Sequence, residues 1–244
     1  VDYTCAAPYL AMNMHPENPL RRLDAIYFSP HKFLGGPGTP GILIFNRSLY
    51  HNTVPDRPGG TPPFLGVIKA ALAVRLKERM GLPELAAREE QIVASMFNEL
   101  AKIPGLTILD GGRKKRLAVF AFTINGLHYN LITRLLNDRS GIQVRGGCAC
   151  AGTYGHCLFK IAPEESKAIT DKIEDGDLSS KPGFARVSLH PMMDNRTISR
   201  ITSALHSVAI YGAEWAKDYQ YSSATNEFMH KNYVASPAEN LFTV

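Results

Sequence analysis

The chain has 244 residues, of which 45% are hydrophobic and 20% charged, a composition typical of a globular protein and unlike that of a disordered one. The formal net charge of +5 is too small and too diffuse to indicate nucleic-acid binding. Four cysteines are too few for a disulfide scaffold, no apolar run reaches the 18 or so residues of a membrane span, and no signal peptide opens the chain. We therefore expect a soluble, reduced, cytoplasmic protein that binds neither nucleic acid nor membranes.

The first sixty residues predict short strands joined by loops. Residues 24–28 and 41–45 are apolar runs of strand length bounded by Pro and Gly, as buried strands usually are. Residues 1–7 are expected to be the end of a further strand. Between the two apolar runs, residues 29–40 form a turn-rich loop in which Lys32 is the only lysine.

Two long helices are predicted next. From Phe64 apolar residues recur every three or four positions, which predicts a helix that ends at Gly81. A second helix is predicted over residues 83–103. The apolar residues with helical spacing are Leu65, Ile68, Ala71, Leu72 and Leu76 in the first helix, and Leu85, Ile92, Met96 and Leu100 in the second.

Beyond Gly105 short strands alternate with helices, which predicts a layered α/β or α+β domain. We interpret the basic run of residues 113–116 as a solvated turn, because a nucleic-acid patch would need aromatic partners. Residues 174–182 are expected to be a polar loop, and Asp194 or Asn195 to cap the last helix. The expected strands are 106–109, 117–123, 141–144 and 184–189, and the expected helices are 130–137 and 197–210.

Lys32 is the first candidate for chemistry. It follows a predicted buried strand and lies in a loop rich in Gly and Pro, beside Ser29 and His31. Partial desolvation there would favour the neutral amine, which is a nucleophile toward carbonyl compounds. Ser29, His31 and the loop amides are also suited to hold an anion such as phosphate. On composition alone, an ordinary surface lysine is the alternative.

A cysteine-rich segment is the second candidate. Cys148, Cys150 and Cys157 fall within ten residues. These cysteines and His156 are one conceivable tetrahedral zinc site, but their spacing fits the usual ligand patterns poorly and we expect no metal. The other interpretation is a reactive thiol whose thiolate is favoured by the charge of Arg145.

The lysine loop carries a family resemblance. Its Ser-x-His-Lys string, followed by Gly-Pro-x-x-x-Gly, resembles that of the class V aminotransferase superfamily of enzymes that use pyridoxal 5'-phosphate (PLP), in the branch of cysteine desulfurases and selenocysteine lyases. The resemblance implies that Lys32 binds PLP covalently and that Ser29 and His31 contact its phosphate. It also implies that Asp2 pairs with the pyridine nitrogen of the cofactor and so keeps the ring an electron sink. The sequence departs from the family at Cys5, where a Gln is usual.

Three further positions match the family. Gly-Thr-Pro before the first long helix implies that Thr61 reaches the cofactor phosphate of a neighbouring subunit, and hence a homodimer; otherwise this tripeptide is a good helix start. The pattern Val-Arg-x-Gly-x-x-Cys-Ala selects Cys150 as the sulfur-accepting cysteine, with Arg145 as a substrate-binding residue. The strand at residues 184–189 is similar to the family strand whose arginine binds the substrate carboxylate, which selects Arg186.

Together these matches imply an α/β protein of the fold-type I PLP-dependent transferases. Residues 1–82 would be the C-terminal part of the large PLP-binding domain, and residues 83–244 a linking helix and a small α+β domain. The implied activity is that of a cysteine desulfurase, which converts an amino-acid substrate, cysteine, to alanine and leaves a persulfide on Cys150. An aminotransferase without desulfurase activity and a non-catalytic fragment or dimerisation module are the alternatives. Because family members begin well before the Val-Asp strand, we expect a longer enzyme and weak or absent PLP binding by this chain alone.

Overall fold

The computed structural model describes residues 1–54, 59–148 and 152–234. The chain divides into two compact units, which we call unit 1 (Val1–Gln91) and unit 2 (Ile92–Val244). The predicted division after residue 82 concerns the domains of the family and stays a prediction. Among the described residues, no helix is both long and apolar enough to cross a membrane.

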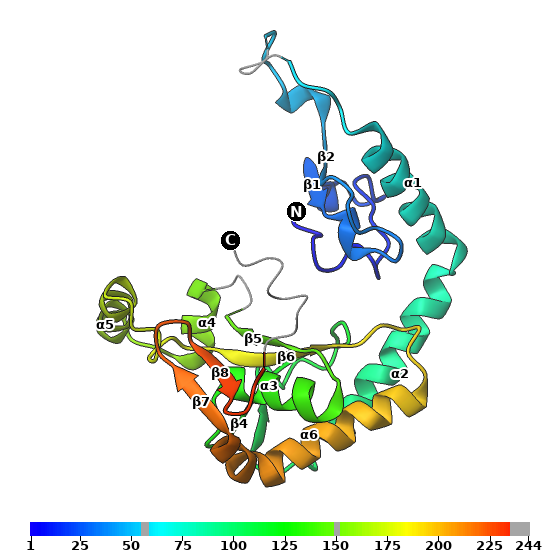
Figure 1. Cartoon of the computed structure of the whole chain (residues 1–244). Helices are drawn as coiled ribbons and strands as arrows, with labels where there is room; N and C mark the ends of the chain where they lie inside the picture. Colours follow the sequence, from blue (N-terminus) through cyan, green and yellow to red (C-terminus); the bar gives the residue numbers. More distant parts are fainter. Residues whose placement is uncertain (55–58, 149–151, 235–244) are drawn as a thin grey trace. The chain divides into compact units, whose positions relative to one another are not determined.

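Unit 1 contains a small sheet and one long helix (Figure 1). The strand end predicted at residues 1–7 is limited to residues 1–3, where Asp2 forms a parallel bridge with Tyr27, because the chain then turns over residues 4–9. Elsewhere in the unit the predicted strands are confirmed. The sheet consists of the antiparallel strands β1 (Ala25–Phe28) and β2 (Ile42–Phe45), and the long helix is α1 (Phe64–Arg79).

Helix α1 buries a different face from the one that its apolar spacing predicts. The helix stops before Gly81, as predicted, and that glycine has a φ of 80° that few other residues adopt. However, Leu65 is 83% exposed and Leu72 is 60% exposed. The buried face consists of Ala70, Ala73 and Lys77. Small side chains let this face approach the loop after β1, and so they decide which side of α1 is covered.

Unit 2 is built on a four-stranded antiparallel sheet in the order β3-β4-β6-β5, with α3 and α6 on one face (Figure 1). Most predicted elements are confirmed to within a few residues, but the strand expected at 141–144 lies at 145–147. The α4 and α5 helices and the final hairpin were not predicted. The elements are α2 (Leu82–Leu100), β3 (Leu106–Ile108), β4 (Val119–Ile124), α3 (Tyr129–Ser140), β5 (Arg145–Gly147), α4 (Gly152–Phe159), α5 (Pro163–Glu174), β6 (Phe184–Ser188), α6 (Asn195–Trp215), β7 (Tyr219–Ser222) and β8 (Glu227–His230).

The core of unit 2 lies between its sheet and its helices. Phe120 and Phe122 of β4 are fully buried, whereas Ala121 between them points to the opposite face, as the alternation of a strand requires. The Phe97 ring of α2 meets the Phe120 ring edge to face, with centroids 5.3 Å apart. The predicted apolar face of α2 is confirmed, since Leu85, Ile92, Met96 and Leu100 are all at most 6% exposed.

Candidate active site

Asp2 and Lys32 lie on neighbouring segments of unit 1. The backbone of Asp2 forms a parallel bridge with Tyr27 of β1, and Lys32 ends the 3-10 turn η2 (Pro30–Lys32) that follows β1. Hydrogen bonds from Thr4, one of them 2.7 Å from its backbone N–H to Oδ1, hold the pKa of Asp2 below its ordinary value, and the Lys32 charge adds to this effect. The structure therefore brings an ionised carboxylate within electrostatic reach of the Lys32 amine.

The turn η2 presents its polar side chains outward. Pro30 and Phe33 are buried, and the two residues between them, His31 and Lys32, are exposed. The expected desolvation of Lys32 is thus wrong for unit 1, because the apolar residues on either side anchor the turn and leave the amine in water. The loop then turns tightly at Gly36, where a Cβ atom would lie only 1.8 Å from the Pro30 carbonyl oxygen.

Ser29 and Thr61 are two of the candidate phosphate-binding residues of unit 1, and they lie on separate segments of the chain. Ser29 is half-buried at the start of η2, and its hydroxyl does not cap that turn. Thr61 is exposed just before α1, after Gly59 and Gly60, both of which have positive φ. The Ser29 hydroxyl is therefore not committed to the turn that it begins.

Lys77 is a residue of unit 1 that the sequence analysis missed. It is only 7% exposed, and its Nζ donates to the carbonyl oxygens of Ala7 at 2.6 Å and Leu10 at 2.5 Å. Nζ also lies 5.6 Å from the centre of the ring of Phe33, the residue that follows Lys32 in the sequence. Burial lowers the pKa of this amine. Lys77 thereby ties the turn that follows Asp2 to the residue that follows Lys32, a role that the printed sequence does not signal.

Arg145 and Arg186 are cross-strand neighbours in unit 2. They face each other in the antiparallel register of β5 and β6, and Ala121 of β4 is the next residue in the same row. Because Phe120 and Phe122 point to the helices, this row faces away from them. The Nε of Arg186 is buried and has no hydrogen-bond partner among the described residues. The register therefore places two cationic residues side by side on this face of the sheet.

The cysteine segment is described only in part. Cys150 lies outside the described residues. Cys148 is half-buried, its Sγ donates to the Pro182 carbonyl oxygen at 2.9 Å, and burial raises its pKa. Cys148 is therefore a protonated thiol, and the thiolate expected beside Arg145 is not found at this position. Cys157 is exposed on α4.

The fourth member of the conceivable zinc set, His156, has a hydrogen-bond partner. Its Nδ1 lies 2.9 Å from the Ser166 hydroxyl oxygen. Within the described part of the chain, no three His, Cys, Asp or Glu side chains are grouped so that they could hold a metal ion. We therefore build no metal chemistry on this segment.

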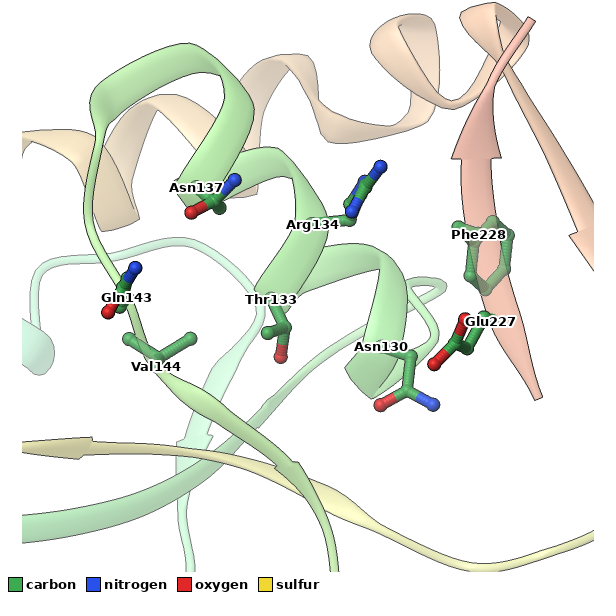
Figure 2. Close-up of a pocket in the computed structure, with 8 residues that line it drawn as sticks. All are labelled: Asn130, Thr133, Arg134, Asn137, Gln143, Val144, Glu227 and Phe228. Atoms are coloured by element: carbon green, nitrogen blue, oxygen red, sulfur yellow. The ribbon is translucent and has the colours of Figure 1, made fainter. Parts of the chain in front are cut away.

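Two adjoining cavities follow β5 and the residues that lead into it. A cavity of about 550 Å³ is lined by Arg145, Cys148 and neighbouring residues. A second cavity, of about 450 Å³, lies between α3, the segment that carries Gln143, and the beginning of β8 (Figure 2). Asn130 and Glu227 line both cavities. A polar groove thus runs beside β5 toward Cys148.

The hairpin that borders this groove could have been predicted. Tyr219, Tyr221, Phe228 and His230 alternate with other residues around a short loop that contains Asn226. Aromatic residues at every second position on both sides of a turn residue are typical of a β-hairpin.

Comparison with known proteins identifies relatives for most of the chain. A profile of the family "Aminotransferase class-V" matches residues 51–201. The chain is 35% identical over 131 residues to a probable cysteine desulfurase of Xylella fastidiosa (strain Temecula1), covering 53% of this chain and 30% of that protein.

Solved structures extend the likeness to the fold. The chain is similar to a NifS-like protein from Rickettsia africae, with a TM-score of 0.62 and 19% identity over 85% of this chain and 52% of the other. It is also similar to a cysteine desulfurase from Thermococcus onnurineus in its apo form, with a TM-score of 0.60 and 22% identity, over 86% and 52%. The chain thus spans about half the length of these structures and 30% of the bacterial relative.

Proposed function

Because the chain belongs to the class V aminotransferase family, we propose that the protein that contains it is a PLP-dependent cysteine desulfurase. Its fold is that of the fold-type I PLP-dependent enzymes, of which it spans about half. The proposed reaction takes cysteine and the thiol of Cys150 to alanine and a persulfide on Cys150. The match to the family profile together with the likeness to a probable cysteine desulfurase is the observation that supports this proposal most.

The residues of unit 1 fit the cofactor. Asp2 is an ionised carboxylate within electrostatic reach of Lys32, as a pyridinium nitrogen and a cofactor-binding amine require. PLP, when bound, withdraws electrons from the α-carbon of an amino acid. Lys32 is the candidate for the covalent link to PLP and for moving a proton at the substrate α-carbon. Ser29, His31 and Thr61 are the candidates that bind the phosphate.

Arg145 and Arg186 would bind the substrate carboxylate. A carboxylate takes hydrogen bonds from the planar fork of an arginine in pairs, and these two arginines are cross-strand neighbours. It would also supply an acceptor for the buried Arg186 Nε. An α-amino acid supplies such a carboxylate beside its reacting carbon.

Cys150 would accept the sulfur. Its thiolate forms a bond to the sulfur of the substrate while the carbon–sulfur bond of the substrate breaks and the released carbon takes up a proton. The products are alanine and a persulfide, so that atoms and electrons balance without an external oxidant. Cys148 is unsuited to this role, because its thiol is partly buried and donates a hydrogen bond to Pro182.

The assay follows alanine and sulfide released from cysteine by the complete protein with added PLP and a thiol reductant. We expect Cys150→Ser to remove sulfide release and Cys148→Ser to retain it. Arg186→Lys should raise KM for cysteine by about tenfold, because the ammonium loses one hydrogen bond of the bidentate pair. Alanine formation that is unchanged in Cys150→Ser would exclude this desulfurase mechanism.

Two alternatives give different results. Transfer of an amino group to a 2-oxo acid, without sulfide from cysteine, would identify a class V aminotransferase. A protein that gains no Lys32-dependent visible absorbance with excess PLP would instead be a non-catalytic module. Lys32→Ala is the control for the absorbance measurement.

We also propose that the protein is a cytoplasmic homodimer. Helix α1 exposes Leu65, Ile68 and Leu72 on one side, and a contiguous apolar surface of this kind is typical of an interface. Thr61 directly precedes this helix. Leu72→Glu should shift the protein from dimer to monomer in light scattering, whereas Leu20→Glu, at a residue that is 95% exposed away from α1, should not.

A further inference from the structure

Asn226 is the hub of a hydrogen-bond network in unit 2. It lies in the turn between β7 and β8 with a φ of 58°, which asparagine tolerates better than most residues, and it is only 6% exposed. Its Nδ2 donates to the Tyr129 hydroxyl at 2.6 Å, and its Oδ1 accepts from the Tyr221 hydroxyl at 2.9 Å. Its backbone oxygen accepts from Asn130 Nδ2 at 2.5 Å. Both polar ends of the side chain are therefore used.

Tyr129 connects Asn226 to the segment before β6. Its hydroxyl donates to the Lys181 carbonyl oxygen at 3.0 Å. Its ring packs so closely on Gly183 that a Cβ atom there would lie 2.6 Å from it, and a Cβ atom at Gly146 of β5 would lie 3.4 Å away. The Tyr129 side chain is thus held between the end of β5 and the beginning of β6.

Cys148 binds the same segment at the next residue. Its Sγ donates to the Pro182 carbonyl oxygen, directly after the Lys181 carbonyl that Tyr129 binds. The hairpin adds a backbone bond, from the Leu178 N–H to the Ser223 oxygen at 2.9 Å. Two successive carbonyls are therefore fixed by two side chains, one on α3 and one just after β5.

We infer that Asn226 is a positioning residue that, through Tyr129, fixes residues 181–183 and with them Cys148. This network holds the strand that carries Arg186 against the strand that leads into the cysteine loop. The inference rests on the proposed function for its meaning in catalysis, but its geometry belongs to unit 2 alone. A chain of buried hydrogen bonds is rigid only while each member keeps its partner.

The test compares two tyrosines of the same unit that each lose one hydroxyl. Tyr129→Phe removes the link to Lys181, whereas Tyr219→Phe removes a bond of 3.0 Å to Asp138, which does not belong to this network. The probe is iodoacetamide, and mass spectrometry of the peptides follows Cys148, with the exposed Cys5 and Cys157 as internal references.

We expect Tyr129→Phe to speed alkylation of Cys148 about tenfold, the factor that corresponds to one lost buried hydrogen bond. Tyr219→Phe should leave the rate within about twofold. Asn226→Gly keeps the positive φ but removes the amide, so it should match Tyr129→Phe. The double variant should add nothing further, because both changes break one chain of bonds.

Equal acceleration in Tyr219→Phe would overturn the inference, because it would indicate general loosening of the unit. An unchanged Cys148 rate in both Tyr129→Phe and Asn226→Gly would overturn it as well. Alkylation needs neither PLP nor substrate, so this result is independent of the proposed function. In an active desulfurase, the same two variants should lower kcat for sulfide release, and Tyr219→Phe should not.

Discussion

Unit 1 and unit 2 bury apolar side chains to very different degrees. Among the residues that the structure describes, the main core of unit 2 contains 23 buried residues, whereas the core cluster of unit 1 contains four, namely Ala7, Phe28, Phe33 and Ala73. In unit 2 the buried side chains of β4, which are at alternate positions, pack against helices. In unit 1 three of the four residues of β2 are exposed, and so is the apolar side of α1. Unit 2 thus completes its own core, whereas unit 1 leaves apolar side chains of β2 and α1 exposed.

The difference also applies to the candidate residues. In unit 1 the polar residues of η2 are exposed, and Lys77 supplies a buried tie between their segments. In unit 2 the candidate arginines lie on a sheet whose other face is tightly packed. The proposed substrate-binding arginines are therefore supported by the packed sheet of unit 2, whereas the proposed cofactor-binding residues His31 and Lys32 lie at the surface of unit 1.

A substitution in the core of unit 2 should lower stability more than any other change proposed for the two units. Phe120→Ala should lower the free energy of unfolding by about 3–5 kcal/mol, because it leaves a cavity against Phe97. Leu20→Ala in unit 1 should change it by less than about 0.5 kcal/mol, because that side chain is 95% exposed. Urea unfolding followed by fluorescence of the single Trp215 and by circular dichroism measures both. Similar losses would contradict the comparison.

A smaller effect is expected for the buried amine of unit 1. Lys77→Met leaves the Ala7 and Leu10 carbonyls without their donor, which should destabilise the turn over residues 4–10 by about 1–3 kcal/mol. Hydrogen exchange of the Ala7 amide measures this opening. Lys69→Met is the control, because its Nζ binds the Pro37 carbonyl at an exposed site and should leave that turn unchanged.

Alkaline pH should affect unit 2 through Tyr219. Burial, followed by the hydrogen bond to Asp138, raises the pKa of its phenol to about 12. Between pH 10 and 12 the unfolded chain loses this proton while the folded chain keeps it, so the stability contributed by the neutral phenol is lost as pH rises. Tyr219→Phe should flatten this fall in urea unfolding at a series of pH values. If the stability of the variant falls equally steeply with pH, the loss of stability comes from other tyrosines and not from Tyr219.

The smallest effect is expected on the acid side. Burial lowers the pKa of His128, whose Nδ1 accepts from the Asn130 N–H at 3.1 Å and so caps α3. Below pH 6.5 the unfolded chain binds a proton before the folded one, so stability falls as pH falls toward the folded pKa. His128→Asn keeps a capping oxygen but cannot titrate, and should reduce that fall. The fall in stability that remains in this variant should come partly from His190, because burial also lowers the pKa of that side chain.

Local patterns predicted much of unit 2. The apolar spacing of α2, the cap at Asp194 and the strand that contains Arg186 were all readable, because each element buries a regular face and begins or ends at a residue with a local preference. Helices α4 and α5 were missed, because Gly and charged residues interrupt their apolar spacing. The strand β5 was predicted a few residues too early. Gly146 and Gly147 have low strand propensity, and they form a strand because they pair with β6.

Short strings of residues and their spacing were sufficient to predict the family, the lysine loop and the order of the candidate residues. The three-dimensional structure was needed to learn which face of α1 is buried, that Arg145 pairs in register with Arg186, and that Cys148 is held as a thiol. Each of these depends on contacts between segments far apart in the chain, namely Lys77 with Ala7, β5 with β6, and Cys148 with Pro182. Register and burial are properties of such pairs, so no local pattern contains them.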